Sequence, residues 1–207
     1  MAKLASRNLS IEIRFLELDR DDWIQYEFIF LYKDQPIIQD KLIKRFNEHR
    51  PRRSPGAFPS NEEAADDGGS IIYALQEALE TDEMQYHETI EPDFIFAIYP
   101  DMAFPFMPSR YVRVYTSEKV QREERQREED RAAAGGKLPD DVFTVIMMAD
   151  VFNFGDEIAY CGEGPAIVMK VSRLDLQNFL EDYQREYKEF CHVWGISPAN
   201  RNIPNND

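Results

Sequence analysis

Cysteine and histidine are scarce in this chain, and their scarcity limits the chemistry to be expected. The only cysteines, Cys161 and Cys191, have no Cys-x-x-Cys spacing, so they form neither a disulfide scaffold nor a zinc ribbon. We expect both to be reduced thiols in the core, with a single disulfide between them as the alternative. The three histidines, His49, His87 and His192, belong to no HxxH or HExxH motif. The sequence therefore predicts no metal site and no bound cofactor.

Long apolar runs are also missing from the sequence. No stretch approaches the roughly 18 uncharged apolar residues that a membrane-spanning helix requires, and the first residues lack the apolar core of a signal peptide. We therefore expect a cytoplasmic protein that does not enter a membrane. With 207 residues, 43% of them hydrophobic, the chain can bury one sizeable core. We expect a single domain over residues 1–207.

Recognisable catalytic motifs are missing as well. There is no G-x-S-x-G elbow, and Gly162 and Gly164 lack the third glycine and the Lys-Ser/Thr of a phosphate loop, so a hairpin turn explains them better. Carboxylate pairs such as Glu88 with Glu91 occur, but among 39 acids such pairs are expected by chance. We therefore favour a non-enzymatic protein. The alternative is a hydrolytic enzyme that uses carboxylates and histidines in a cleft near residues 99–109.

Basic residues are missing from residues 54–109, and this is the strongest functional signal in the sequence. The window contains no Lys or Arg but twelve Asp and Glu residues, which account for most of the net charge of −15. Such a charge asymmetry creates a negative field that attracts cationic partners and repels nucleic acid. The simpler interpretation is that these acids only keep the protein soluble.

The charge pattern predicts an acidic binding protein that neutralises or regulates a basic protein partner, such as a toxin, a nuclease or a nucleic-acid-binding protein. A bacterial immunity protein or nuclease inhibitor acts in this way. The acids expected to contact the partner are Glu80, Asp82, Glu83, Glu88, Glu91, Asp93 and Asp101. The one basic segment, residues 44–53, is expected to be a solvated loop or an internal electrostatic partner, because a nucleic-acid-binding domain is usually basic overall.

The hydrophobic periodicity predicts an α+β fold, in which an antiparallel sheet of about six strands carries two or three helices mainly on one face. A parallel α/β arrangement is the second choice. The clearest strands alternate apolar and polar residues or form short apolar runs rich in β-branched and aromatic residues. They are expected near residues 9–15, 23–32, 37–43, 84–90, 94–99, 111–115, 142–154 and 166–171.

Helices are predicted where apolar residues recur at intervals of three and four. One helix is expected over residues 70–80. The C-terminal helix is expected to begin after Ser172, as N-cap with Asp175 as its capping-box partner, and to end at Gly195. Its predicted buried stripe consists of Leu176, Phe179, Leu180, Tyr183, Tyr187 and Phe190.

A third predicted helix, residues 117–131, is almost wholly charged and has no apolar face for packing. It is expected to project into solvent or to dock on a partner, and the latter would suit a subunit of an oligomeric bacterial defence assembly. Residues 46–69 and 132–140 are rich in Pro, Gly and charged residues and are expected to be flexible loops. Residues 198–207 form a polar segment that is expected to be a frayed tail.

Overall fold

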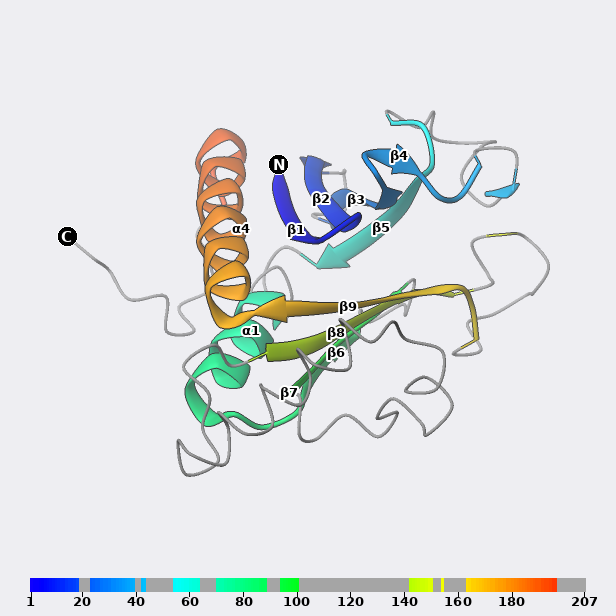
Figure 1. The fold of residues 1–207 in the computed structure, drawn as a ribbon. Helices are drawn as coiled ribbons and strands as arrows, with labels where there is room; N and C mark the ends of the chain where they lie inside the picture. The colour runs from blue at the N-terminus through cyan, green and yellow to red at the C-terminus, as the bar shows by residue number, and fades with distance from the viewer. Residues whose placement is uncertain are drawn as a thin grey trace, which may run out of the picture.

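Two antiparallel β-sheets and two helices make up the described part of the protein, which is seen in a computed structural model (Figure 1). The structure describes residues 1–18, 23–39, 42–43, 54–63, 70–88, 94–100, 142–150, 154 and 163–196. The α+β class and the antiparallel pairing are confirmed. The strands divide between a five-stranded and a four-stranded sheet, however, instead of forming one sheet of about six strands. The elements expected at residues 111–115 and 117–131 lie outside the described residues.

The first sheet contains the N-terminal strands. Its members are β1 (Ala2–Ser6), β2 (Leu9–Leu18), β3 (Trp23–Tyr32), β4 (Gln35–Pro36) and β5 (Ala57–Glu63). They lie in the order β1-β2-β3-β4, and β5 also pairs with β3. As expected from its apolar residues on both sides, β3 is buried on both faces. The strand expected over residues 37–43 is replaced by the two-residue β4 opposite Leu31 and Tyr32, because β5 occupies this edge of β3 from Trp23 to Ile29.

β5 lies inside the segment 46–69, which its composition led us to expect as a flexible loop. Its residues pair with β3 from Ala57 opposite Ile29 to Glu63 opposite Trp23. The ring of Phe58 also stacks on Phe28, with ring centroids 5.1 Å apart. Strand formation therefore depends here on pairing and burial more than on the intrinsic preference of the residues.

The second sheet has the order β6-β7-β8-β9. Its strands are β6 (Gln85–Glu88), β7 (Phe94–Pro100), β8 (Val142–Ala149) and β9 (Ala166–Ser172). β8 and β9 pair antiparallel, whereas Gly162 of the predicted hairpin turn lies outside the described residues. Gly164 precedes β9 and lies so close to β8 that a Cβ atom would collide with the Ala149 carbonyl oxygen. Glycine therefore permits the Ala149 N–H to donate to the Pro165 carbonyl at 3.0 Å.

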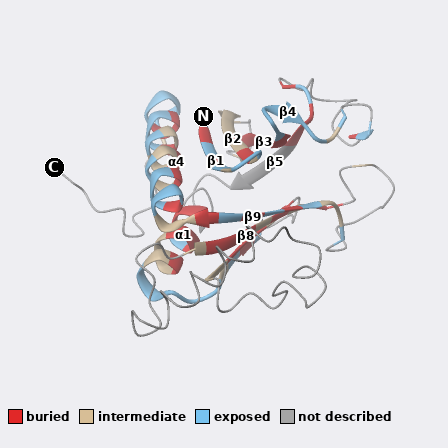
Figure 2. Cartoon of the chain, viewed as in Figure 1, coloured by how far each residue is buried: buried red, intermediate tan, exposed pale blue. Residues whose placement is uncertain are grey.

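The two described helices are α1 (Ser70–Thr81) and α4 (Arg173–Trp194). Both predicted ends of α4 are confirmed. The Asp175 N–H donates to the Ser172 hydroxyl at 3.1 Å, the Ser172 N–H donates to the Asp175 carboxylate at 3.2 Å, and Gly195 adopts the left-handed conformation. The buried face of α4 points toward the sheets and its exposed face points outward (Figure 2). Neither described helix combines the length and apolar character that crossing a bilayer requires.

Aromatic side chains join these elements into one hydrophobic core. Phe94 of the second sheet contacts Tyr26 and Phe28 of the first, with ring centroids 5.8 and 5.0 Å apart. Phe15 of β2 packs against the predicted stripe of α4, with its ring 5.3 Å from that of Tyr183. α4 therefore covers the end of the core at β1 and β2, and α1 packs against both α4 and the second sheet (Figure 1).

Candidate functional site

The nine residues from Glu80 to Glu88, here called the 80–88 segment, link the last turn of α1 to β6. Four of the seven predicted partner-binding acids lie in it, and all four are exposed: Glu80, Asp82, Glu83 and Glu88. The other three, Glu91, Asp93 and Asp101, lie outside the described residues. Exposed residues predominate along this stretch of chain (Figure 2).

The fold of α1 explains why the segment is presented to solvent. Ile71, Ile72, Leu75 and Ala78 are buried in the core, as their spacing predicts. This orientation leaves Glu80 on the outer side of the helix. Farther along, β6 alternates, so that His87 is buried while Tyr86 and Glu88 on either side are exposed.

Two large apolar side chains in the same segment were not predicted as site residues. Met84 is 41% exposed and Tyr86 is 58% exposed. Their position could have indicated them from the sequence, because both lie among the acids of the window that lacks Lys and Arg. Exposed Tyr and Met are enriched where proteins bind one another. The segment therefore combines negative charge with apolar contact area.

Asp82 differs from the other three acids because an arginine of α4 binds it. The Arg173 guanidinium forms an ion pair with the Asp82 carboxylate. Its Nη1 also donates a 2.5 Å hydrogen bond to the carbonyl oxygen of Leu79, in the last turn of α1. The same guanidinium lies 5.1 Å from the centroid of the Phe143 ring. No pattern in the sequence indicates this contact, since Arg173 and Asp82 are 91 positions apart.

The acids of the window from 54 to 109 do not all share this location. β5 carries Glu62 and Glu63 in the first sheet, whereas the 80–88 segment leads into the second. The described part of the window thus contributes one continuous acidic stretch, the 80–88 segment, together with Glu77 in α1 and two acids on a strand of the other sheet.

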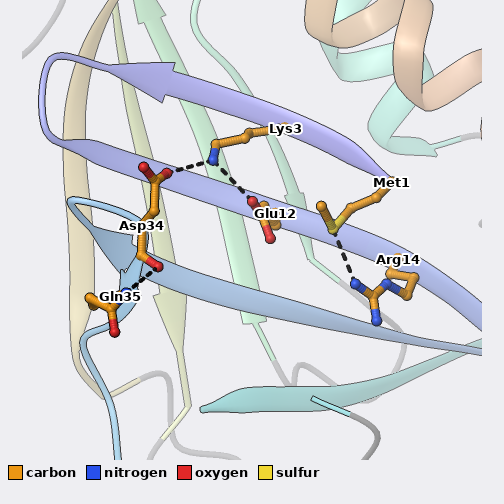
Figure 3. A network of polar contacts seen from close by, with 6 residues as sticks. All are labelled: Met1, Lys3, Glu12, Arg14, Asp34 and Gln35. Atoms are coloured by element: carbon orange, nitrogen blue, oxygen red, sulfur yellow. Dashed lines mark hydrogen bonds and ion pairs between the residues drawn. The ribbon is translucent and has the colours of Figure 1, made fainter. Parts of the chain in front are cut away.

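Charges on the outer face of the first sheet form a separate network of cross-strand pairs (Figure 3). Lys3 Nζ lies 2.8 Å from Asp34 and 3.1 Å from Glu12, its direct partner across β1 and β2. The hydrogen bonds that the Lys3 ammonium donates to Asp34 and Glu12 raise its pKa above the ordinary value. These charges satisfy one another and stabilise the sheet.

A buried carboxylate extends this pattern on β3. Glu27 accepts a 2.5 Å hydrogen bond from the Ser54 hydroxyl, and Arg14 lies 3.3 Å from the same carboxylate oxygen. Arg14 also donates to the Ser54 oxygen at 2.9 Å. This set contains no histidine that could activate Ser54 as a nucleophile, and its carboxylate is ion-paired with Arg14. It fixes the start of β5 to the middle of the sheet.

The residues considered for metal binding and thiol chemistry are dispersed. His87 is buried with its ring 5.8 Å from that of Phe94, and His192 is exposed in the last turn of α4. Among the residues that the structure describes, no group of three or more His, Cys, Asp or Glu is arranged to hold a metal ion. Cys191 is a free, buried thiol, as expected. Cys161 and His49 lie outside the described residues.

Comparison with protein-family models, with curated proteins and with solved structures finds no match for this chain. A function therefore has to be inferred from the chain's own residues.

Proposed function

We propose that this chain is a non-enzymatic binding protein that captures a basic protein through the 80–88 segment, as immunity proteins and nuclease inhibitors do. The observation that carries the proposal is the make-up of this segment. Within nine consecutive residues it exposes four acids and two large apolar side chains, and it contains no Lys or Arg. Both elements of a protein interface, complementary charge and apolar contact, are thus present on one short stretch.

The apolar residues supply the contact area that charge alone does not provide. Met84 is flexible and adapts its shape to a partner surface. The Tyr86 ring offers a face to a lysine or arginine of the partner, and such a contact contributes about 0.5–1 kcal/mol at an exposed site. A cationic partner therefore gains more from this segment than from an equal number of isolated carboxylates.

The charge of the whole chain favours encounter with the same class of partner. The net charge of −15 attracts cationic proteins over a distance limited by salt. This long-range attraction accelerates association, and the exposed acids of the 80–88 segment then orient the partner. Glu91, Asp93 and Asp101 follow the segment closely in the chain and are proposed as an extension of the same surface. We place this capture in the cytoplasm.

The proposal is tested by removing the charge of the segment without altering its fold. The wild-type chain is expected to retain a basic protein from a native lysate. We expect the triple variant E80Q/E83Q/E88Q to retain less of that protein, by about tenfold or more. This estimate assumes about 0.5–1 kcal/mol for each lost charge contact. Retention is measured by affinity capture at low salt, and the captured protein is identified by mass spectrometry.

The matched control is E163Q/E181Q/E189Q, which removes the same charge from exposed positions outside the segment. It should retain the partner nearly as well as the wild type, and wild-type retention should fall steeply when the salt concentration is raised. An equal loss in both triple variants would show that only net charge matters. An acidic partner, or capture that salt does not weaken, would refute the proposal.

A further inference from the structure

We infer that Arg173 is a positioning residue for the 80–88 segment, and that Asp82 serves as the binding partner of Arg173 instead of contacting the incoming protein. This inference rests on the proposed function. It divides the exposed acids into one that holds the segment in place and three, Glu80, Glu83 and Glu88, that remain available to a partner.

The contacts of Arg173 fix the end of α1. A helix leaves its last carbonyl groups without intrahelical donors, and the Leu79 carbonyl receives its donor from Arg173 at 2.5 Å. The second arm of the guanidinium binds Asp82 immediately after the helix. One planar side chain thus joins two points of the chain at a helix end, a geometry that lysine cannot reproduce.

The location of the guanidinium makes these contacts firm. Its carbon atom lies over the Phe143 ring of β8, and the Arg173 side chain is only 25% exposed. Arg173 is also the first residue of α4, directly after the capped Ser172. The arginine therefore stands at the capped start of α4, packed against β8, and from there it binds the end of α1.

The backbone conformation at Asp82 sets the direction of the exposed residues that follow it. Asp82 adopts a φ of 55°, in the left-handed region that turns the chain sharply out of the helix. The Thr81 hydroxyl accepts from the Glu83 N–H at 3.2 Å and donates to the Glu77 carbonyl at 2.7 Å. The direction in which Glu83, Met84 and Tyr86 leave α1 is set at this turn, which Arg173 holds.

Glu80 and Glu88 differ from Asp82 in their charged contacts. Neither forms an ion pair with any base in the described part of the chain. A partner's lysine or arginine can approach these carboxylates without displacing an internal cation. At Asp82 it would have to displace Arg173 and leave the Leu79 carbonyl without its donor, which is unfavourable.

Two single-charge variants separate the roles. D82N and E80Q each remove one negative charge from positions two residues apart, and asparagine tolerates the left-handed backbone of residue 82. We expect D82N and R173A to accelerate amide hydrogen exchange in residues 79–88 by about fivefold or more, since each releases the turn. E80Q should leave exchange in these residues unchanged, and exchange in residues 183–190 of α4 should stay constant in all three variants.

Binding supplies the decisive measurement, with the purified basic protein captured by the wild type as the probe. R173A makes the chain more negative and frees the Asp82 carboxylate, so an effect of charge alone would strengthen binding. If Arg173 positions the segment, its loss weakens binding instead, and we expect R173A to weaken binding by about fivefold or more. V145A, a buried substitution in β8, lowers global stability without touching the turn and should leave affinity nearly unchanged while the protein is folded.

The outcomes distinguish the two proposals. If E80Q weakens binding while R173A leaves it unchanged or strengthens it, Arg173 does not position the surface and only the inference fails. If D82N weakens binding without accelerating exchange, Asp82 contacts the partner directly and the inference again fails alone. If E80Q, D82N and R173A all leave binding unchanged, or no basic protein is captured, the proposed function fails and the inference falls with it.

Discussion

At the scale of single residues, Cys191 shows how burial controls reactivity. Cys191 is only 1% exposed and lies on the buried face of α4. Burial raises the pKa of its thiol above the ordinary value, although a hydrogen bond with Tyr187 acts in the opposite direction. Because the thiolate is the reactive form, the folded protein keeps this cysteine unreactive. The expectation of a reduced core thiol is thus confirmed for Cys191.

The raised pKa predicts a loss of stability in alkaline solution. Below the unfolded-state pKa, at roughly 8.5, the thiol is neutral in both states and its contribution to stability is complete. As the pH rises through the folded-state pKa, the unfolded chain ionises first and the free energy of unfolding falls. We expect urea denaturation to show this fall above about pH 8.5, and the variant C191A to show a smaller one. Parallel curves for the two proteins would contradict it.

Arg173 marks the limit of what sequence could predict at this scale. The acids of the 80–88 segment can be recognised in the sequence because no Lys or Arg occurs near them in the chain. Arg173, which binds Asp82, belongs to a different helix, and the charge pattern along the sequence does not indicate this contact. Asp82 was therefore grouped with Glu80 and Glu83, although the structure gives it an internal ion pair that they lack.

At the scale of elements, local signals predicted well and distant pairing did not. Both ends of α4 were predicted because an N-cap serine and a C-terminal glycine act on their immediate neighbours. β5 was not, because Pro59 and the acids around it resemble a loop and only the partner strand β3 makes them a strand. β5 also takes the place beside β3 that residues 37–43 were expected to occupy.

The N-cap of α4 gives an element-scale prediction. We expect S172A to lower the free energy of unfolding by about 1 kcal/mol, because the hydroxyl no longer accepts from the Asp175 N–H. Thermal or urea denaturation measures the change. Q177A, on the exposed face of the same helix, is the control and should change stability by less than about 0.5 kcal/mol. Equal effects of the two variants would rule out a capping role for Ser172.

At the scale of the whole molecule, the two sheets and two helices of the described residues are joined by a shared hydrophobic core. Nothing in the periodicity of the strands indicates how many sheets they form, so one sheet was the simpler prediction. The division depends on side-chain contacts such as those of Phe94 with Tyr26 and Phe28, which join strands far apart in sequence. The expectation of a single domain stays a prediction, which unfolding can test.

We expect the wild type to unfold in one transition, with the fluorescence of Trp23 and Trp194 changing together with the far-ultraviolet circular dichroism. F94A should lower the free energy of unfolding by about 3–5 kcal/mol, because it leaves a cavity between the sheets. L174A, at a residue that is 63% exposed, is the control and should have little effect. Two separate transitions in the wild type would show that the sheets fold independently.

The contact between the sheet margins has a consequence for how the protein behaves at high concentration. β1 and β9 are the outermost strands of their sheets, and the Ser6 hydroxyl of one donates to the Lys170 carbonyl of the other. An unprotected margin is a template on which another chain can add a strand and begin aggregation. Here the two margins meet where Ser6 contacts Lys170, so that a strand of another chain is hindered from adding to either margin at this point.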